Sequence, residues 1–250
     1  MRIDILTLFP EMCEAFLSES IIGRARKNNY VDIECHNIRD YTKDKHNRVD
    51  DAPYGGGMGM ILSAQPVFDC VNAVKEKCET TPRIIYMSPK GQIFNQQKAA
   101  ELSKLDNIIL LCGHYEGIDE RVLESVVDEE ISIGDFVVTG GEIPAVTVAD
   151  AVCRMLPGVL SDDVCFSEES HFNGLLEYPQ YTRPAEWNGI KVPEILLSGH
   201  HKNIERWRRE KSLEITLNKR PDMLEKADIT KADIEYLCKI KADFSKSDTE

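Results

Sequence analysis

Apolar and polar positions along the first 160 residues predict strands that alternate with helices. Continuous or alternating apolar runs indicate five strands, at residues 3–8, 31–38, 83–87, 107–112 and within 130–138. Apolar residues at helical spacing, with capping residues and prolines at the starts, indicate five helices, at 11–28, 63–78, 96–104, 117–127 and 144–156. This order favours an α/β domain built on a mainly parallel sheet.

Three local features refine this pattern. Met12, Phe16, Leu17 and Ile21 form the apolar stripe of the first helix. The Ser-Pro-Lys-Gly sequence at 88–91 is expected to end the strand at 83–87. Residues 39–60 form a long polar segment that ends in PYGGGMGM, and a loop of that length in a compact domain is usually functional or disordered.

The pattern changes after residue 160. Residues 161–182 lack clear periodicity and are rich in Ser, Asp and Glu, which is typical of a linker. From 183 to 250 the pattern is helical, clearest at 202–210 and 231–242. We therefore predict a domain at 1–160, a linker at 161–182 and a small all-α domain at 183–250.

Composition points to a cytoplasmic globular protein. The hydrophobic fraction is 42%, no apolar run is long enough for a membrane span, and the N-terminus reads as a strand and not as a signal peptide. The eight cysteines include no CxxC pair, which favours reduced, buried thiols over disulfides or zinc ligands.

The net charge of −13 argues against nonspecific nucleic-acid binding, which needs clustered Lys and Arg. The charge is uneven, however, because residues 202–220 hold seven basic residues against three acids. Charge alone favours an ordinary solvated helix face there over an anion-binding surface.

Glycine-containing turns follow three of the expected strands, at 86–91, 112–117 and 133–141. Glycines let the backbone approach a ligand closely. No GxGxxG motif follows a strand and no GxxxxGK[ST] motif occurs, which disfavours a dinucleotide or P-loop site. Together the turns indicate a neutral or weakly charged ligand, such as an adenosine, bound through backbone groups.

These turns also carry a family resemblance. The chain resembles the bacterial tRNA (guanine-N1-)-methyltransferases of the TrmD family almost from end to end, in the strings YGGGMGM (54–60), SPKG (88–91), CGHYEGIDERV (112–122), DEEISIGDFVVTGGEIPA (128–145), LLEYPQYTRP (175–184), VPEILLSGHH (192–201) and RWR (206–208).

The resemblance implies a deep trefoil knot of the SPOUT class in the α/β domain. Pattern alone favours an unknotted doubly wound sheet, because knots are nearly absent from proteins. The resemblance also implies that the knot binds S-adenosylmethionine, through Tyr86, Ser88, Pro89, Gly113, Tyr115, Glu116, Ser132, Ile133, Gly134, Asp135, Phe136, Val137, Val138, Gly140, Gly141 and Pro144.

The implied reaction methylates N1 of guanosine 37, next to the tRNA anticodon. Guanine N1 carries a proton at neutral pH, so a positioned base must remove it. In similar proteins the base is a linker Asp, and the matching residue here is Glu169, a carboxylate one methylene longer. Glu168 is the adjacent alternative. Arg154 matches the family's second catalytic residue, with a role in stabilising charge on the base or the methionine moiety.

The resemblance further implies a homodimer with composite sites, a tRNA substrate with G at positions 36 and 37, and dependence on Mg²⁺ whose ligands no cluster in the sequence identifies. The flipped guanosine and the anticodon stem would be contacted by His46, Asp50, Tyr54, Gly59, Arg206, Arg208 and Arg209.

Two alternatives stay open. One is another knotted RNA methyltransferase, which modifies a ribose or a different base and needs no linker carboxylate. The other is a nucleic-acid-binding module that has lost catalysis, which the replacement of Asp by Glu169 favours.

Overall fold

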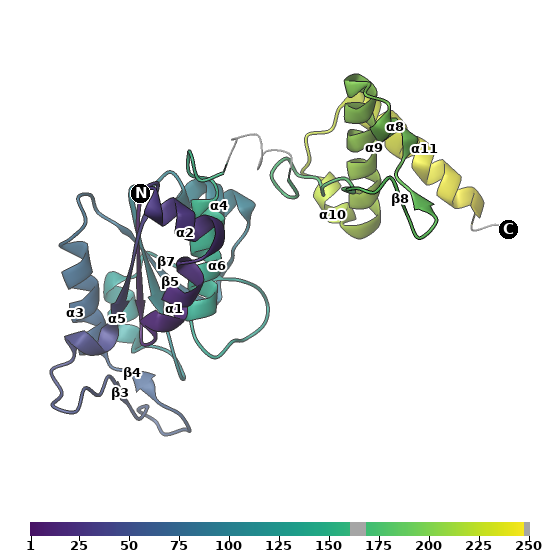
Figure 1. Cartoon of the computed structure of the whole chain (residues 1–250). Coiled ribbons are helices and arrows are strands. Elements are labelled where there is room, and N and C mark those ends of the chain that lie inside the picture. Colours follow the sequence, from purple (N-terminus) through teal and green to yellow (C-terminus); the bar gives the residue numbers. More distant parts are fainter. Residues whose placement is uncertain (161–168, 248–250) are drawn as a thin grey trace. The chain divides into compact units, whose positions relative to one another are not determined.

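A computed structural model describes residues 1–160 and 169–247, which fall into two units, Met1–Asp163 and Val164–Glu250 (Figure 1). A five-stranded sheet in the order β2-β1-β6-β5-β7 forms the centre of the first unit, and every neighbouring pair is parallel. The strands are β1 (Arg2–Thr7), β2 (Asp32–Asn37), β5 (Arg83–Ile93), β6 (Asn107–Cys112) and β7 (Glu129–Ser132). The expected α/β class with a parallel sheet is confirmed.

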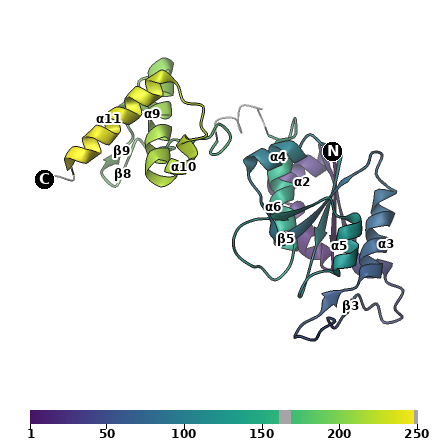
Figure 2. The ribbon, with the colours of Figure 1, turned by 180° about the vertical axis from the view of Figure 1, so that it is seen from behind.

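Helices cover both faces of this sheet (Figures 1 and 2). One face packs against α1 (Pro10–Leu17), α2 (Ser20–Lys27), α4 (Gln96–Leu102) and α6 (Glu142–Cys153). The opposite face packs against the 3-10 helix η1 (Ile38–Tyr41), α3 (Ala64–Lys75) and α5 (Glu120–Val126).

The central strand β6 is apolar from Ile108 to Cys112 because both of its faces are buried. Ile108, Leu110 and Cys112 belong to one core, Ile109 and Leu111 to the other, and all six residues of the strand are buried. A parallel strand with helices on both faces has no polar side, so it reads as a continuous apolar run.

The single helix expected at 11–28 is wrong, because the structure divides it into α1 and α2. Ser20 has a φ of 55°, and a Cβ on Gly23 would collide with the Ser18 carbonyl, so the chain turns back tightly at this point. The expected stripe is also wrong in part. Leu17 is fully buried, whereas Met12 and Phe16 remain 49% and 48% exposed.

Two further expectations change. Strand β5 does not end at Met87 but continues to Ile93, and Ser88–Gly91 form a bulge because Ile131 of β7 pairs with both Met87 and Gln92. The polar segment at 39–60 is partly ordered, since β3 (Asp50–Asp51) pairs with β4 (Ile61–Leu62) in an antiparallel ribbon.

The second unit consists mainly of helices α8 (Glu194–Leu197), α9 (His201–Lys219), α10 (Pro221–Leu224) and α11 (Lys231–Ser247). It also contains the antiparallel ribbon of β8 (Glu186–Trp187) and β9 (Ile190–Lys191), so the purely helical expectation is wrong here. Asn188 and Gly189 both have positive φ, as two-residue Asn-Gly hairpins require. That dipeptide was a readable hairpin signal in the sequence.

In the part of the chain that the structure describes, no helix is both long and apolar enough to cross a membrane.

A buried charge network joins the edge strand β2 to its neighbour β1. The Asp4 side chain is fully buried, and its Oδ1 lies 2.7 Å from both His36 Nε2 and Arg2 Nη2. Arg2 Nη2 also donates to Glu34 Oε2 at 2.6 Å. Burial alone would raise the pKa of Asp4, but the hydrogen bonds from His36 and Arg2 outweigh it and lower the pKa.

We predict that Asp4→Asn lowers the free energy of unfolding by about 3 kcal/mol at pH 7, because it removes one partner of a buried ion pair. The native pKa is depressed, so the contribution of Asp4 is complete above its unfolded pKa of about 3.9 and is lost as the pH falls through the lower native pKa. Urea unfolding followed by far-UV circular dichroism measures this.

The control is Asp32→Asn, which removes an exposed contact to Arg2 and should cost less than about 0.5 kcal/mol. A stability gap between the wild type and Asp4→Asn that does not shrink below about pH 4 would contradict the assignment.

Candidate functional site

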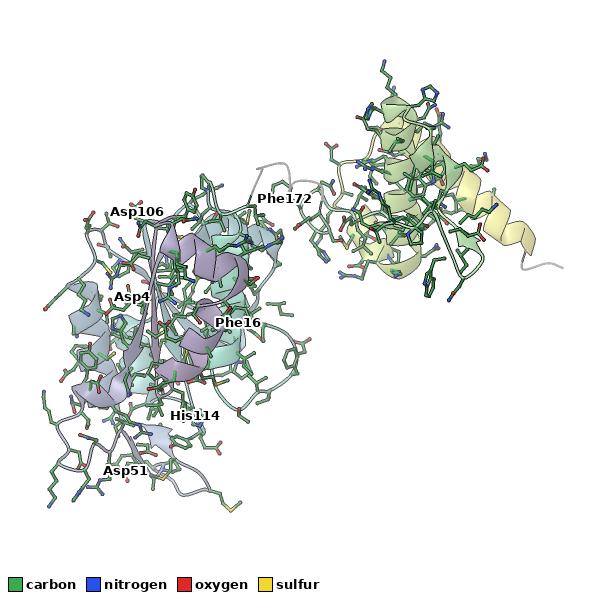
Figure 3. The ribbon with its side chains drawn as sticks, in the orientation of Figure 1. Asp4, Phe16, Asp51, Asp106, His114 and Phe172 are labelled. Atoms are coloured by element: carbon green, nitrogen blue, oxygen red, sulfur yellow. The ribbon has the colours of Figure 1, made fainter. Side chains whose placement is uncertain are left out.

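A cavity of about 330 Å³ opens where β5, β6 and β7 reach their carboxyl ends. Figure 3 marks this end, because Asp106 before β6 and His114 after it lie at opposite ends of the unit. Ligand sites of α/β sheets form at this edge. The lining consists of Tyr86, Met87, Ser88, Pro89, Lys90, Gly113, His114, Tyr115, Glu116, Gly117, Ile131, Ser132, Ile133, Phe136, Val137, Val138, Thr139, Gly140, Gly141 and Pro144.

Two glycine corners are bound to each other beside this cavity. The N–H of Gly141 donates to the carbonyl of Gly113 at 2.8 Å, and His114 forms an isolated antiparallel bridge with Gly140. A Cβ on Gly141 would lie 2.7 Å from the Cys112 Cα, and a Cβ on Gly113 would lie 2.6 Å from the Tyr86 hydroxyl. Only glycine lets these backbone segments come so close.

The turn after β6 also depends on unusual backbone geometry. Tyr115 has a φ of 56° and Gly117 a φ of 118°, and the N–H of Gly117 donates to the carbonyl of His114 at 3.0 Å. The N–H of Glu116 donates to the Met60 carbonyl at 3.1 Å. The turn is therefore attached on one side to the glycine-rich segment and on the other to Gly141.

The chemistry of the cavity is that of backbone groups and apolar walls. The Tyr86 ring is buried, and burial, with a smaller effect of Glu130, raises the pKa of Tyr86 to about 12, so its hydroxyl stays protonated. Phe136 and Val137 line the cavity yet remain 55% and 82% exposed, which leaves apolar surface for a ligand or partner to cover.

The structure brings together almost the whole residue set expected to bind the cofactor. Gly134 and Asp135 are the two that do not line the cavity. Sequence reasoning missed six lining residues, although all but Met87 lie inside the motifs quoted: Met87, Lys90, His114, Gly117, Ile131 and Thr139.

The residues expected to contact guanosine divide into two groups. Tyr54 is fully exposed and lines a second hollow that shares Tyr86, Lys90 and Glu116 with the cavity. A Cβ on Gly59 would lie 2.5 Å from Glu116 Oε1, so Gly59 also borders the site. His46 is exposed and Asp50 lies in β3, and neither lines the cavity or this hollow.

The three arginines of α9 have different environments. Arg206 pairs with Glu210 on an exposed face, at 2.7 Å. Arg209 donates to Asp233 and to the Asp228 carbonyl, which makes it a structural link between α9 and the segment at α11. The Arg208 guanidinium lies 4.8 Å above the Tyr178 ring, and its Nε is buried without a hydrogen-bond partner.

The two residues expected to act in catalysis lie in different units. Arg154 follows the last residue of α6 and borders a separate hollow with Phe16 and Asp150. Burial raises the pKa of Asp150, and Arg154 partly offsets this. Glu169 belongs to the second unit, where its carbonyl accepts from the Phe172 N–H at 3.4 Å. Glu168 lies outside the described residues, as does the rest of the expected linker before residue 169.

Among the described residues, one group of side chains has metal-ligand spacing: Asp4, Glu34 and His36. Arg2 already donates to both carboxylates of this group. Mg²⁺ needs octahedral oxygen ligands and keeps several waters, so a group with an imidazole and an inserted guanidinium does not fit it.

Comparison with known proteins identifies relatives along nearly the whole chain. Residues 1–226 match the family described as "tRNA (Guanine-1)-methyltransferase TrmD". Three similar proteins are each named tRNA (guanine-N(1)-)-methyltransferase. The one from Ruminiclostridium cellulolyticum is 61% identical over 90% of this chain and 97% of the relative. Those from Clostridium beijerinckii and Halalkalibacterium halodurans are 57% and 52% identical, over 95% and 96% of this chain and 98% of each relative.

We predict that Gly141→Ala lowers the free energy of unfolding by about 1–3 kcal/mol, because the added Cβ overlaps the Cys112 backbone. The N–H of residue 141 is kept, so the effect reports packing and not a lost donor. Thr139→Ala, at an exposed position of the same loop, should stay within about 0.5 kcal/mol of the wild type. Equal effects of the two changes in urea unfolding would show that the glycine corner is not tightly packed.

Proposed function

The chain belongs to the tRNA (guanine-1)-methyltransferase TrmD family, and on this premise we propose that it transfers a methyl group from S-adenosylmethionine to N1 of guanosine 37 in tRNA. The observation that carries the proposal is the cavity at the ends of β5, β6 and β7. Its lining contains nearly all of the residues that the family resemblance assigns to the cofactor.

The cavity suits S-adenosylmethionine in size and chemistry. Its volume of about 330 Å³ lies within the range of small-molecule sites. Backbone groups at Gly113, Tyr115 and Gly140 can read a nucleoside, and Phe136 and Val137 can cover its apolar faces. The bound cofactor supplies an electrophilic methyl group on a sulfonium.

Glu169 is proposed as the general base. Removal of the guanine N1 proton makes N1 nucleophilic, and a carboxylate within hydrogen-bond reach of that proton can accept it. The guanosine must first leave its stack, and the exposed Tyr54 and the segment around Gly59 border the site where it would enter. Glu169, where similar proteins have Asp, keeps the carboxyl group and lengthens the side chain by one methylene.

Arg154 supports a site made by two subunits. Helix α6 spans 12 residues, so its ends lie about 18 Å apart. Gly141 and the cavity are at its first residue and Arg154 follows its last, so Arg154 cannot reach the cavity of its own chain. For Arg154 to stabilise charge in catalysis, a partner subunit must bring it to the partner's cavity.

The exposed face of α1 and α6, which includes Phe16 beside Arg154, offers a place for that partner. Four large apolar side chains on this face remain 39–49% exposed: Phe9 in the turn before α1, Met12 and Phe16 of α1, and Ile143 of α6. Apolar patches of this kind mark protein–protein contacts. We therefore include a homodimer in the proposal, with each active site assembled from both chains.

Contacts with the tRNA would come partly from α9. Arg208 is the best candidate of the three arginines for a tRNA contact, because stacking on Tyr178 holds its guanidinium in one orientation. Arg206 would add charge, whereas Arg209 serves mainly to hold Asp233.

A trefoil knot is also proposed, and the return of residues 140–141 to pair with 113–114 supports it. No step is assigned to Mg²⁺. A cytoplasmic location accords with a tRNA substrate.

We predict that Glu169→Gln reduces formation of 1-methylguanosine by at least about 100-fold, since a general base contributes 10²–10⁴-fold. Affinity for S-adenosylmethionine should stay close to that of the wild type, and Glu169→Asp should retain activity. The assay incubates tRNA transcripts with G at positions 36 and 37 and analyses the nucleosides after digestion.

The products separate the alternatives. A 2′-O-methylated nucleoside would identify a different knotted methyltransferase, and no methylated product from the wild type would favour a binding module. If Glu168→Gln abolishes turnover and Glu169→Gln does not, the base is the neighbouring residue.

A second prediction concerns the composite site. Glu169→Gln and Gly141→Val should each be inactive as homodimers. If Glu169 of one chain serves the cavity of its partner, a mixed dimer holds one complete site. Half of the dimers are mixed on co-expression, so about a quarter of the wild-type rate should return. Light scattering should give the mass of a dimer for both variants. Failure of the mixed dimers to recover activity would place the base and the cavity on the same chain.

A further inference from the structure

Thr7, His114 and Glu142 form a cluster around Gly140, behind the cavity, and the proposed reaction uses none of them. Thr7 ends β1, His114 follows β6 and Glu142 begins α6, so three segments far apart in the sequence meet here. His114 is one of the labelled residues in Figure 3.

Glu142 is a buried hydrogen-bond acceptor. Glu142 is 3% exposed, and its Oε1 accepts from the Thr7 hydroxyl at 2.6 Å. The Thr7 oxygen itself accepts from the Phe9 N–H at 2.9 Å, so the proton of the hydroxyl is directed to Glu142. An ionised carboxylate is favourable in the first turn of α6, where the helix dipole is positive.

A ring nitrogen of His114 next to Gly140 forms no hydrogen bond. The ring is held against Phe9 and Tyr115, with ring centroids 5.0 Å and 4.6 Å away. Its Nδ1 is buried and has no hydrogen-bond partner. An unpaired buried polar atom is unfavourable, so this nitrogen should acquire a partner when the site is assembled.

Gly140 explains how the two side chains can meet. A Cβ on Gly140 would collide with Glu142 Oε2 and would lie 2.7 Å from His114 Nδ1. Both atoms therefore lie next to the same point, and the missing side chain leaves the space between them open. The glycine serves this approach of His114 and Glu142.

In the structure Nδ1 of His114 and the Glu142 carboxylate are not hydrogen-bonded to each other. We propose that a shift of the His114 ring brings Nδ1, carrying a proton, to Glu142 across Gly140, and that the contact so formed fixes the two corners of the cofactor cavity. His114 is thus a positioning residue, because Glu142, held by Thr7, sets the orientation of its ring. The contact joins residues 113–115 to residues 140–141, which lie on two sides of the cavity. The functional part rests on the proposed binding of S-adenosylmethionine there.

The position of the proton is measured directly by NMR on the full-length wild-type protein labelled with ¹⁵N-histidine. Comparison with the spectrum of His114→Asn assigns the signal. A proton on Nδ1 whose signal shifts in Glu142→Gln supports the proposal, and an unprotonated Nδ1, or a signal that Glu142→Gln leaves unchanged, overturns it. This readout needs no cofactor, so it stands even if the proposed function fails.

Binding of S-adenosylmethionine, measured by calorimetry, tests the positioning role. Asn places an amide near the position of Nδ1, whereas Gln places it near Nε2. His114→Asn should bind within about threefold of the wild type, and His114→Gln and Glu142→Gln should bind about tenfold or more weakly, as expected for loss of a hydrogen bond to a charged group.

Circular dichroism and unfolding midpoints confirm that each variant is folded. Equal affinities of His114→Asn and His114→Gln would overturn the assignment of Nδ1. If the wild type does not bind S-adenosylmethionine at all, the proposed function fails, and the NMR result alone decides the His114–Glu142 contact.

Discussion

The hydrogen bond from the Gly141 N–H to the Gly113 carbonyl is the interaction on which the site depends. It joins the turn after β6 to the start of α6, and the close approach depends on Gly141, because a Cβ there would overlap the Cys112 backbone. The 133–141 segment must therefore return to β6 after the chain has passed through β7. The cavity is the space that this return encloses.

The sheet provides the rigid base for this arrangement. Because β6 is buried on both faces, its end is fixed by two separate cores, and the turn at 113–117 starts from an immobile point. The bulge at Ser88–Gly91 lets β5 remain paired with β7 while Ser88 and Pro89 line the cavity. Ligand contact thus falls largely to the backbone and to apolar side chains.

The same unit leaves features that one chain does not complete. Apolar residues on α1 and α6 remain exposed, and Arg154 is separated from the cavity of its own chain by the length of α6. Both observations accord with the proposed dimer with shared active sites. Under that proposal, Arg154 acts in catalysis only in the assembly.

The sequence by itself determined the parallel sheet and the positions of its five strands and, through the family motifs, most of the lining of the cavity, because these depend on local periodicity and on glycines at strand ends. It also contained the Asn188-Gly189 hairpin signal, although a helical reading of that region overlooked it. Tertiary structure alone decided that α1 and α2 separate at Ser20 and that β5 continues past its bulge. It also decided that His114, Thr7 and Glu142 meet around Gly140, since no local pattern records which distant segments pack together.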